Sequence, residues 1–222
     1  THVLAVRDRL KESGALAENE PFAIGLRLSA VAARELLDGG HLQDFKNWLE
    51  RTNTYVFTIN GFPYGSFHGT RVKEQVFMPD WTEQARVDYT KDLFRILATI
   101  ARPGTGASVS TLPGSHKTFH ADEAPIRRNL IELATWLEEL AAETGHDFHL
   151  GLEPEPLGHF ENTVETLEFF ERLHAEAPDA EILRRRIGVN FDTCHFALEY
   201  DGARMSLDEL TKAGIRISKI HL

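Results

Sequence analysis

Six short apolar segments alternate with longer segments of helical periodicity, and this alternation restricts the fold of the chain more than any other feature. The short segments cover residues 22–28, 55–59, 107–112, 148–152, 187–191 and 215–220. Several of them are rich in β-branched and aromatic residues, which is typical of β-strands. A regular alternation of strands and helices predicts a parallel sheet whose strands are joined by right-handed crossovers.

Polar residues that begin helices mark the boundaries of the segments between the strands. Ser29 and Thr82 each precede a stretch with apolar residues at helical spacing, so both are predicted N-caps. Asn162 and Ser206 are each followed three residues later by Glu, which is the capping-box pattern. The sequence therefore predicts helices that start at these four positions.

Polar side chains follow the carboxyl ends of several predicted strands, and this placement favours a barrel. The active sites of (β/α)8 barrels are built at that face. We therefore predict an α/β chain that forms one domain over residues 1–222, a (β/α)8 TIM barrel, with a doubly wound parallel sheet as the alternative. The Gly104-Thr105-Gly106 segment precedes the third strand, so it does not fit a dinucleotide-binding fingerprint.

The number of strands leads to a further expectation about this barrel. Eight strands close such a barrel, and the sequence shows six. Thr1 falls within a helical segment that precedes any strand, and Leu222 directly follows the last strand. We therefore expect the first and the last strands of the barrel to lie outside this sequence, so that the domain is truncated at both ends.

Three consecutive predicted strands end in residues that can bind a metal ion. Glu153 follows the fourth apolar segment, Asp192 follows the fifth, and His221 follows the sixth. Neighbouring parallel strands would bring these side chains into one mouth. Each residue taken singly also has an ordinary structural role, so the prediction rests on their agreement. Two carboxylates and an imidazole suit one divalent metal ion, Mn²⁺, Co²⁺, Mg²⁺ or Zn²⁺.

The segment from Asn60 to Trp81 is long and contains several aromatic residues. A loop of more than about 12–15 residues is usually functional or disordered, and the aromatic content disfavours disorder. We predict a lid or substrate wall in which His68, Arg71 and Lys73 contact an anionic or polyhydroxyl ligand. The alternative is a packed surface loop. His116, after the third strand, would face the same mouth.

Charge and composition disfavour several classes of partner. The net charge is −10 and no long cluster of Lys and Arg is present, which disfavours binding to nucleic acid. No apolar run approaches the ~20 residues needed to cross a bilayer. Cys194 is the single cysteine, which fits a reducing compartment. We therefore predict a cytoplasmic protein whose partner is a small-molecule metabolite; the sequence leaves the oligomeric state open.

Several motifs resemble those of known families. The motifs "EPEP" at 153–156, "VNFDTCH" at 189–195 and "ISKIHL" at 217–222 resemble the later strands of the xylose isomerase-like TIM-barrel superfamily. That superfamily includes sugar isomerases, ketose 3-epimerases and endonuclease IV-type phosphodiesterases. The block "NGFPYGSFHGTRVKEQVFMPDW" at 60–81, followed by "STLPGS" at 110–115, is more distinctive and is similar to EboE-type metabolite traffic proteins.

The superfamily resemblance implies roles for individual residues. It implies that Glu153, Asp192 and His221 bind the metal ion, together with a Glu on the last barrel strand that is absent from this sequence. It also implies that His195 contacts the substrate, as the matching histidine does in the epimerases. In the endonuclease branch the matching histidine binds a second metal ion.

Three hypotheses about function follow from these features. The first is a metal-dependent sugar or sugar-phosphate isomerase or epimerase, or a relative that acts on a polyol-like metabolite, with Glu153 as metal ligand and candidate base and His195 holding a substrate oxygen. The second is a binding or traffic protein of the EboE type without turnover, because Phe62, Tyr64 and Phe67 suit an apolar ligand. The third is an endonuclease IV-like phosphodiesterase that uses several zinc ions.

Overall fold

The computed structural model describes residues 2–65 and 73–222, and in this part of the chain six parallel strands form one sheet. The strands are β1 (Phe22–Arg27), β2 (Thr54–Asn60), β3 (Ala107–Thr111), β4 (Phe148–Leu152), β5 (Ile187–Asp192) and β6 (Arg216–His221). The helices are α1 (His2–Glu12), α2 (Ala30–Leu37), α3 (His41–Arg51), α4 (Gln84–Ile100), α5 (Glu123–Thr144), α6 (Thr163–Glu176), α7 (Ala180–Arg186), α8 (Thr193–Leu198) and α9 (Ala203–Lys212), with short 3-10 helices η1 (Lys73–Phe77) and η2 (Lys117–Phe119). None of the helices within the described ranges is long and apolar enough to cross a membrane.

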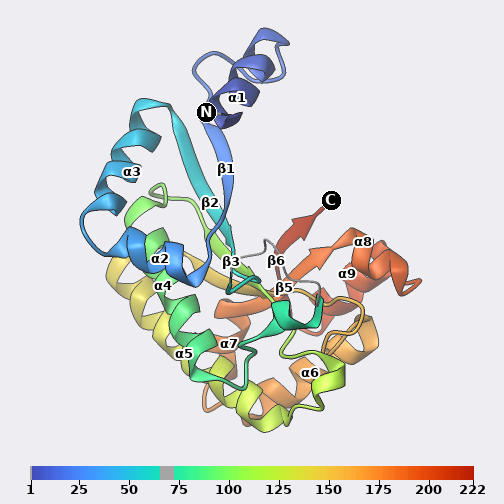
Figure 1. The fold of residues 1–222 in the computed structure, drawn as a ribbon. Helices are drawn as coiled ribbons and strands as arrows, with labels where there is room; N and C mark the ends of the chain where they lie inside the picture. The colour runs from blue at the N-terminus through green and yellow to red at the C-terminus, as the bar shows by residue number, and fades with distance from the viewer. Residues whose placement is uncertain (1, 66–72) are drawn as a thin grey trace.

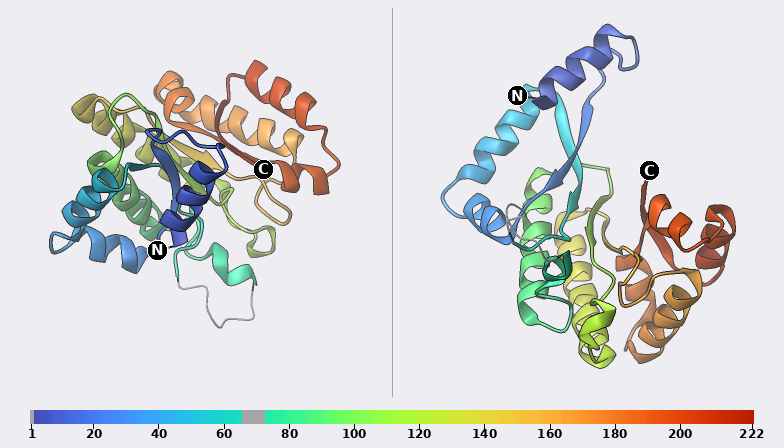
Figure 2. Two further views of the ribbon diagram at one scale, coloured as in Figure 1. Left: turned by 90° about the horizontal axis from the view of Figure 1, so that it is seen from above. Right: turned by 45° about the vertical axis from the view of Figure 1, so that its right-hand side comes forward.

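The order of the strands in space is the same as their order in the chain, β1-β2-β3-β4-β5-β6, and every neighbouring pair is parallel. The sheet forms a partial barrel with helices on its outside, whereas α1 lies apart, beyond the start of β1 (Figure 1 and Figure 2). A doubly wound sheet reverses its strand order at a switch point. The predicted TIM-barrel class is therefore confirmed as a partial barrel of six strands, and the doubly wound alternative is wrong.

The face of the sheet that meets the helices forms the apolar core. The three central strands β3, β4 and β5 are buried at every residue, whereas β1 and β6, at the two edges, are partly exposed. Phe148 of β4 packs against Phe94 of α4, with ring centroids 5.9 Å apart. Val109, Leu150 and Val189 belong to the same core. Along these strands the apolar residues that face the helices alternate with small or polar residues, although both faces of the strands are buried.

The opposite face of these strands, which lines the inside of the barrel, consists of small and polar residues. Ser108 Oγ donates to Thr58 Oγ1 at 2.9 Å, and His149 Nδ1 lies 2.6 Å from Ser218 Oγ. A Cβ atom on Gly151 would lie 3.0 Å from the Ser218 Oγ, so this position leaves no room for a side chain. TIM-barrel interiors are usually filled by bulky branched apolar residues. The polar interior here continues upward into the polar groups of the barrel mouth.

Two of the predicted N-caps are confirmed. The side chains of Ser29 and Asn162 each accept a hydrogen bond from the backbone N–H three residues later, at the starts of α2 and α6. Such caps satisfy N–H groups that have no partner inside the helix. The local sequence is sufficient here, because donor and acceptor belong to the same helical turn.

The other two predicted N-caps are wrong, because tertiary contacts take the hydroxyl groups. Thr82 donates from its backbone N–H and its Oγ1 to Asp80 Oδ1, and α4 begins two residues later at Gln84. Ser206 lies buried inside α9, where its Oγ accepts a hydrogen bond from Thr163 Oγ1 at 2.8 Å. Neither contact is visible in a local pattern.

Arg86 of α4 holds together the two ends of the segment that the sequence predicts to be a lid. Its Nε donates to the carbonyl oxygen of Pro79 at 2.8 Å, and its Nη1 donates to those of Gly61 at 2.8 Å and Phe62 at 3.0 Å. The guanidinium also lies 5.8 Å from the ring centroid of Tyr64. Arg86 is fully buried, and this burial lowers its pKa to about 10. One side chain thus replaces the water that these carbonyl groups would otherwise bind.

We expect Arg86→Met to lower the free energy of unfolding by roughly 3 kcal/mol or more, because it leaves three carbonyl groups without their buried donor. Chemical denaturation followed by circular dichroism measures this loss. Arg95→Met on the exposed face of the same helix is the matched control, with an expected change within ~1 kcal/mol. Equal stabilities of the two variants would contradict the role assigned to Arg86.

Candidate metal centre

The carboxyl ends of β4, β5 and β6 meet at one side of the barrel, and the side chains that end these strands lie there. Glu153 directly follows β4, and its backbone N–H donates to the carbonyl oxygen of Thr111 at 2.9 Å. Asp192 and His221 end β5 and β6 and are paired in register. The sequence predicted this meeting of strand ends correctly, because parallel strands in register end at the same edge.

Glu153, Asp192 and His195 each offer one ligand atom, and these atoms lie within 4.8 Å of one another. His195 Nδ1 lies 3.8 Å from Glu153 Oε1, and His195 Nε2 lies 4.0 Å from Asp192 Oδ2. Both carboxylates are buried. Two carboxylates and an imidazole at this separation could surround a divalent ion.

The position of His195 follows from the way in which Asp192 ends its strand. Asp192 Oδ1 accepts hydrogen bonds from the backbone N–H groups of Cys194 at 2.8 Å and His195 at 3.3 Å, so it is the N-cap of α8. Because α8 begins immediately, His195 lies in its first turn, beside the end of β5. The sequence spacing Asp-x-x-His therefore results in a contact between the two side chains.

His221 contacts only one member of this group. Its Nδ1 lies 3.1 Å from Asp192 Oδ2, and its side chain is 53% exposed. The sequence predicted Glu153, Asp192 and His221 as the metal ligands. The structure brings Glu153 and Asp192 together with His195 within 4.8 Å, so the two sets share two residues. Metal binding by His221 stays a prediction.

The charge state of Glu153 depends on burial and on its neighbours. Burial raises the pKa of Glu153, and the negative charge of Asp192 raises it further. A hydrogen bond from Asn190 Nδ2 to Glu153 Oε2 at 2.6 Å and the nearby charges of His195 and Lys219 act in the opposite direction. A bound cation would favour the charged form in the same way as these neighbours do.

Two titratable residues at this site were not identified from the sequence. Burial raises the pKa of Glu155 to about 8, and the negative charges of Glu153 and Asp192 contribute to the rise. Burial lowers the pKa of Lys219, whose ammonium faces the same two carboxylates. A signal for both existed, because each lies two residues from a predicted ligand. For Lys219 and His221, which are both in β6, that spacing selects the same face of the strand, whereas Glu155 lies after the end of β4.

The remaining predicted substrate-binding residues are only partly covered by the structure. His68 and Arg71 lie outside the described residues, and so does the side chain of Lys73, which begins η1. His116 is buried, its Nδ1 lies 2.8 Å from Thr118 Oγ1, and its ring packs edge-on against Phe77 at 4.8 Å between ring centroids. Contact of these residues with a ligand stays a prediction.

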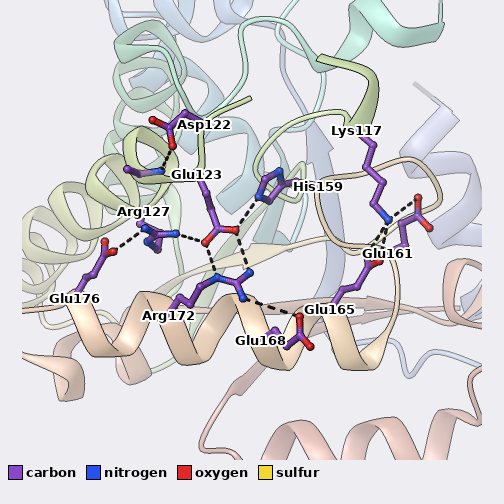
Figure 3. Close-up of polar contacts among 11 residues, drawn as sticks. Lys117, Asp122, Glu123, Arg127, His159, Glu161, Glu165, Glu168, Arg172 and Glu176 are labelled. Atoms are coloured by element: carbon purple, nitrogen blue, oxygen red, sulfur yellow. Dashed lines mark hydrogen bonds and ion pairs between the residues drawn. The ribbon is translucent and has the colours of Figure 1, made fainter. Parts of the chain in front are cut away.

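An ionic network holds the loops beside the mouth together (Figure 3). Glu123 at the start of α5 accepts hydrogen bonds from Arg127 and from Arg172 of α6, and it lies 3.1 Å from His159 Nε2. Although burial alone would raise it, the pKa of Glu123 is lowered to about 2 by hydrogen bonds from Arg172 and His159 and by the charges of Arg172 and Arg127. Nearby, Lys117 Nζ lies 3.0 Å from Glu165 in the same view.

The donor set fits the divalent ion that the sequence predicts. The Nδ1 atom of His195 is buried and has no hydrogen-bond partner among the described residues, although it lies 3.8 Å from Glu153 Oε1. An unpaired buried ring nitrogen is costly, and a metal ion would satisfy it. The residues that could hold an ion are therefore Glu153, Asp192 and His195, with His221 in contact with Asp192.

Comparisons with known proteins show that solved structures share the fold of this chain. No protein-family model matches the sequence, and no curated protein matches it. Several solved structures resemble the chain. A D-tagatose 3-epimerase-like protein is 16% identical, with a TM-score of 0.56, over 90% of this chain and 66% of the other. A xylose isomerase domain containing protein from Salmonella typhimurium LT2 is 14% identical, with a TM-score of 0.52, over 99% and 66%.

A third structure is the IolI protein with a binding zinc atom. It is 14% identical to this chain, with a TM-score of 0.52, over 87% of this chain and 60% of the other. The chain thus spans 60 to 66% of the length of these three proteins. Identities this low establish the fold and nothing more.

Fold and site together define an α/β partial TIM barrel with a group of candidate metal ligands at the carboxyl ends of its strands. The fold matches that of xylose isomerase-like TIM-barrel proteins. The narrower resemblance to EboE-type metabolite traffic proteins stays a prediction.

We expect Asp192→Asn to weaken Mn²⁺ binding by at least ~100-fold while the chain still folds. The amide keeps an oxygen that can cap α8, so the substitution removes the charge and leaves the local hydrogen bonds. Isothermal titration with Mn²⁺ measures the affinity. Asp179→Asn is the matched control, because Asp179 caps α7 through the N–H groups two and three residues later, as Asp192 caps α8. Undiminished Mn²⁺ affinity in Asp192→Asn would refute the assignment of Asp192 as a ligand.

The raised pKa of Glu155 predicts a pH-dependent stability in the metal-free protein. The pKa of Glu155 is 4.5 in the unfolded chain and about 8 in the folded chain. The folding stability that this group contributes is therefore fully present below pH 4.5 and is lost as the pH rises through 8. We expect Glu155→Gln to be more stable than the unchanged protein by ~2–4 kcal/mol at pH 9, with no gain at pH 4.

Chemical denaturation in the presence of a chelator, at both pH values, tests this expectation. Glu35→Gln, at an exposed position on α2, is the control and should change neither stability. A gain for Glu155→Gln that is the same at pH 4 and pH 9 would show that titration is not its cause.

Proposed function

We propose that this protein is a metal-dependent isomerase or epimerase that acts on a small sugar, sugar phosphate or comparable polyol-like metabolite. The observation that supports this best is the meeting of Glu153, Asp192 and His195 within 4.8 Å at the face where TIM barrels build their active sites. A divalent ion bound there would polarise carbonyl and hydroxyl oxygens of a substrate. An isomerase or epimerase of this kind moves a proton beside a carbonyl group.

The residues of the chain supply the groups that such a proton transfer needs. One carboxylate takes a proton from carbon and a second group returns it. Glu153 is the candidate base, and Asn190 fixes its orientation through the hydrogen bond at 2.6 Å. Glu155, whose pKa of about 8 lies near neutral pH, suits the exchange of a proton in either direction. One ring nitrogen of His195 would bind the ion, and the other would hold a substrate oxygen.

The names of two structural neighbours agree with this proposal. One is described as D-tagatose 3-epimerase-like, and the other contains a bound zinc atom. Zinc is one of the four ions that the donor set suits. In the proposal, residues His68, Arg71, Lys73 and His116 contact the part of the substrate that lies away from the metal ion.

The two alternative functions have less support. Phe62 and Tyr64, which suit an apolar cargo of a traffic protein, already pack against Phe77 and Tyr89, with ring centroids 5.1 and 5.2 Å apart. A phosphodiesterase with several zinc ions needs more histidines in the cluster. Among the described residues, the group of candidate ligands within 4.8 Å contains one histidine, His195. Metal content separates these possibilities, since two or three tightly bound ions per chain would favour the phosphodiesterase.

We expect the full-length protein, loaded with Mn²⁺ or Co²⁺, to exchange a carbon-bound proton of its substrate with deuterated water. Proton NMR of a panel of ketoses and ketose phosphates measures this exchange. Glu153→Gln should lower the rate by at least ~100-fold, because the amide cannot accept the proton. The exposed Glu35→Gln variant is the control and should exchange at the rate of the unchanged protein.

The same panel separates catalysis from binding alone. No exchange with any member, combined with a co-purified ligand in native mass spectrometry, would overturn the proposed activity in favour of a traffic protein. Exchange that survives in Glu153→Gln would leave the activity standing and remove Glu153 as the base.

A further inference from the structure

Lys219 of β6 extends into the interior of the barrel. The pairing of β5 with β6 shifts after Val189, and this irregularity places Lys219 beside Asn190. The Lys219 Nζ donates to Ser110 Oγ of β3 at 2.9 Å, so the side chain reaches from one edge of the sheet to a strand three positions away. The ammonium is therefore located inside the mouth and not on the outer surface.

Two strands, β4 and β5, lie between these two partners, and the residue of β4 that pairs with Ser110 is a glycine. Gly151 of β4 is paired with Ser110 of β3 on one side, and a Cβ atom on it would lie 3.1 Å from the Cβ of Asn190 and 3.0 Å from Ser218 Oγ. A larger residue on β4 would crowd the space between β3 and β6. The absence of a side chain at Gly151 is thus consistent with the path of the lysine.

The hydrogen bonds of Lys219 leave part of its capacity unused. An ammonium group carries three donors, and among the described residues Ser110 is its hydrogen-bond partner. Its charge faces Glu153 and Asp192, but neither carboxylate forms an ion pair with it within 4.0 Å in the described part of the chain. A half-buried cation with one neutral partner costs folding free energy, and an aliphatic residue would fill the same space without that cost.

We infer that Lys219 binds an oxygen atom of the substrate, the carbonyl oxygen that becomes negatively charged when the neighbouring carbon loses its proton. This inference rests on the proposed function and names a further residue of the same site. Asn190 connects the two groups, because it pairs with Lys219 on β6 and donates to Glu153 Oε2. Asn190 thereby fixes the position of the candidate base, Glu153, relative to the strand that carries Lys219.

This role defines the class of substrate. The ligand carries a carbonyl oxygen and an adjacent hydroxyl oxygen that can lie side by side, as in a ketose or an α-hydroxy aldehyde. In its deprotonated form this pair of oxygens carries negative charge, which an ammonium stabilises more than it stabilises the neutral ground state. A planar dianion with two adjacent oxygens, oxalate, is a suitable probe.

The test measures the binding of Mn²⁺ and then of oxalate by isothermal titration, with the full-length protein and its Lys219→Met variant. We expect Lys219→Met to bind Mn²⁺ as tightly as the unchanged protein or up to ~10-fold more tightly, because a neighbouring positive charge is removed. We expect the same variant to bind oxalate ~10- to 100-fold more weakly in the presence of Mn²⁺. Lys219→Arg should recover part of this loss, and Lys212→Met, at an exposed position on α9, should change neither affinity.

The outcomes separate this inference from the proposed function. If the unchanged protein binds no Mn²⁺, the proposed function fails and the inference fails with it. If the protein binds Mn²⁺ but Lys219→Met retains full affinity for oxalate, the inference alone is overturned. Loss of Mn²⁺ binding or of folding in Lys219→Met would overturn it too, since Lys219 would then support the site structurally. Inorganic phosphate is the second probe. An equal loss of affinity for phosphate and oxalate in Lys219→Met would overturn the assignment to the carbonyl oxygen, because Lys219 would then recognise any anion.

Discussion

The carboxylate of Asp192 connects the sheet to the candidate metal centre. Its Oδ1 caps α8 through the backbone N–H groups of Cys194 and His195, and its Oδ2 lies 3.1 Å from His221 Nδ1. Because the helix begins directly at the end of β5, the imidazole of His195 lies beside Glu153. One side chain therefore sets both the start of α8 and the position of the residues around the site. A substitution that removes the side-chain oxygens of Asp192 would alter the helix start and the site together.

The interior of the barrel has an electrostatic cost that apolar packing would avoid. Glu153, Glu155 and Asp192 lie near one another in a partly dehydrated mouth, and the burial of a carboxylate is unfavourable unless a cation or donors compensate for it. Lys219, the Asn190 amide and the imidazole of His195 compensate in part. A cluster of titratable groups with shifted pKa values in a cleft is typical of functional sites. A divalent ion would complete the compensation, which is the physical basis of the proposed function.

The walls of the mouth are held by contacts that do not involve the candidate ligands. Arg86 ties the two ends of the Asn60–Trp81 segment to α4 through three carbonyl groups. Glu123 joins α5 to α6 through Arg172. Both sets of hydrogen bonds are formed by guanidinium groups, which have several donors in a fixed geometry and can bind more than one acceptor at once. The loops around the site are thereby positioned by the scaffold before any ligand binds.

The sequence by itself determined the alternation of strands and helices, the parallel sheet, and the arrival of Glu153 and Asp192 at one mouth, because these depend on local periodicity and on the rule that parallel strands end together. Only the tertiary structure decided that His195 completes the group within 4.8 Å and that Lys219 enters the interior. The start of α8 and the irregular pairing of β5 with β6 set those orientations. The misassigned cap at Ser206 has the same cause, since its hydroxyl binds Thr163 of another helix. Local patterns specify elements, whereas the direction of a side chain is settled by partners distant in the chain.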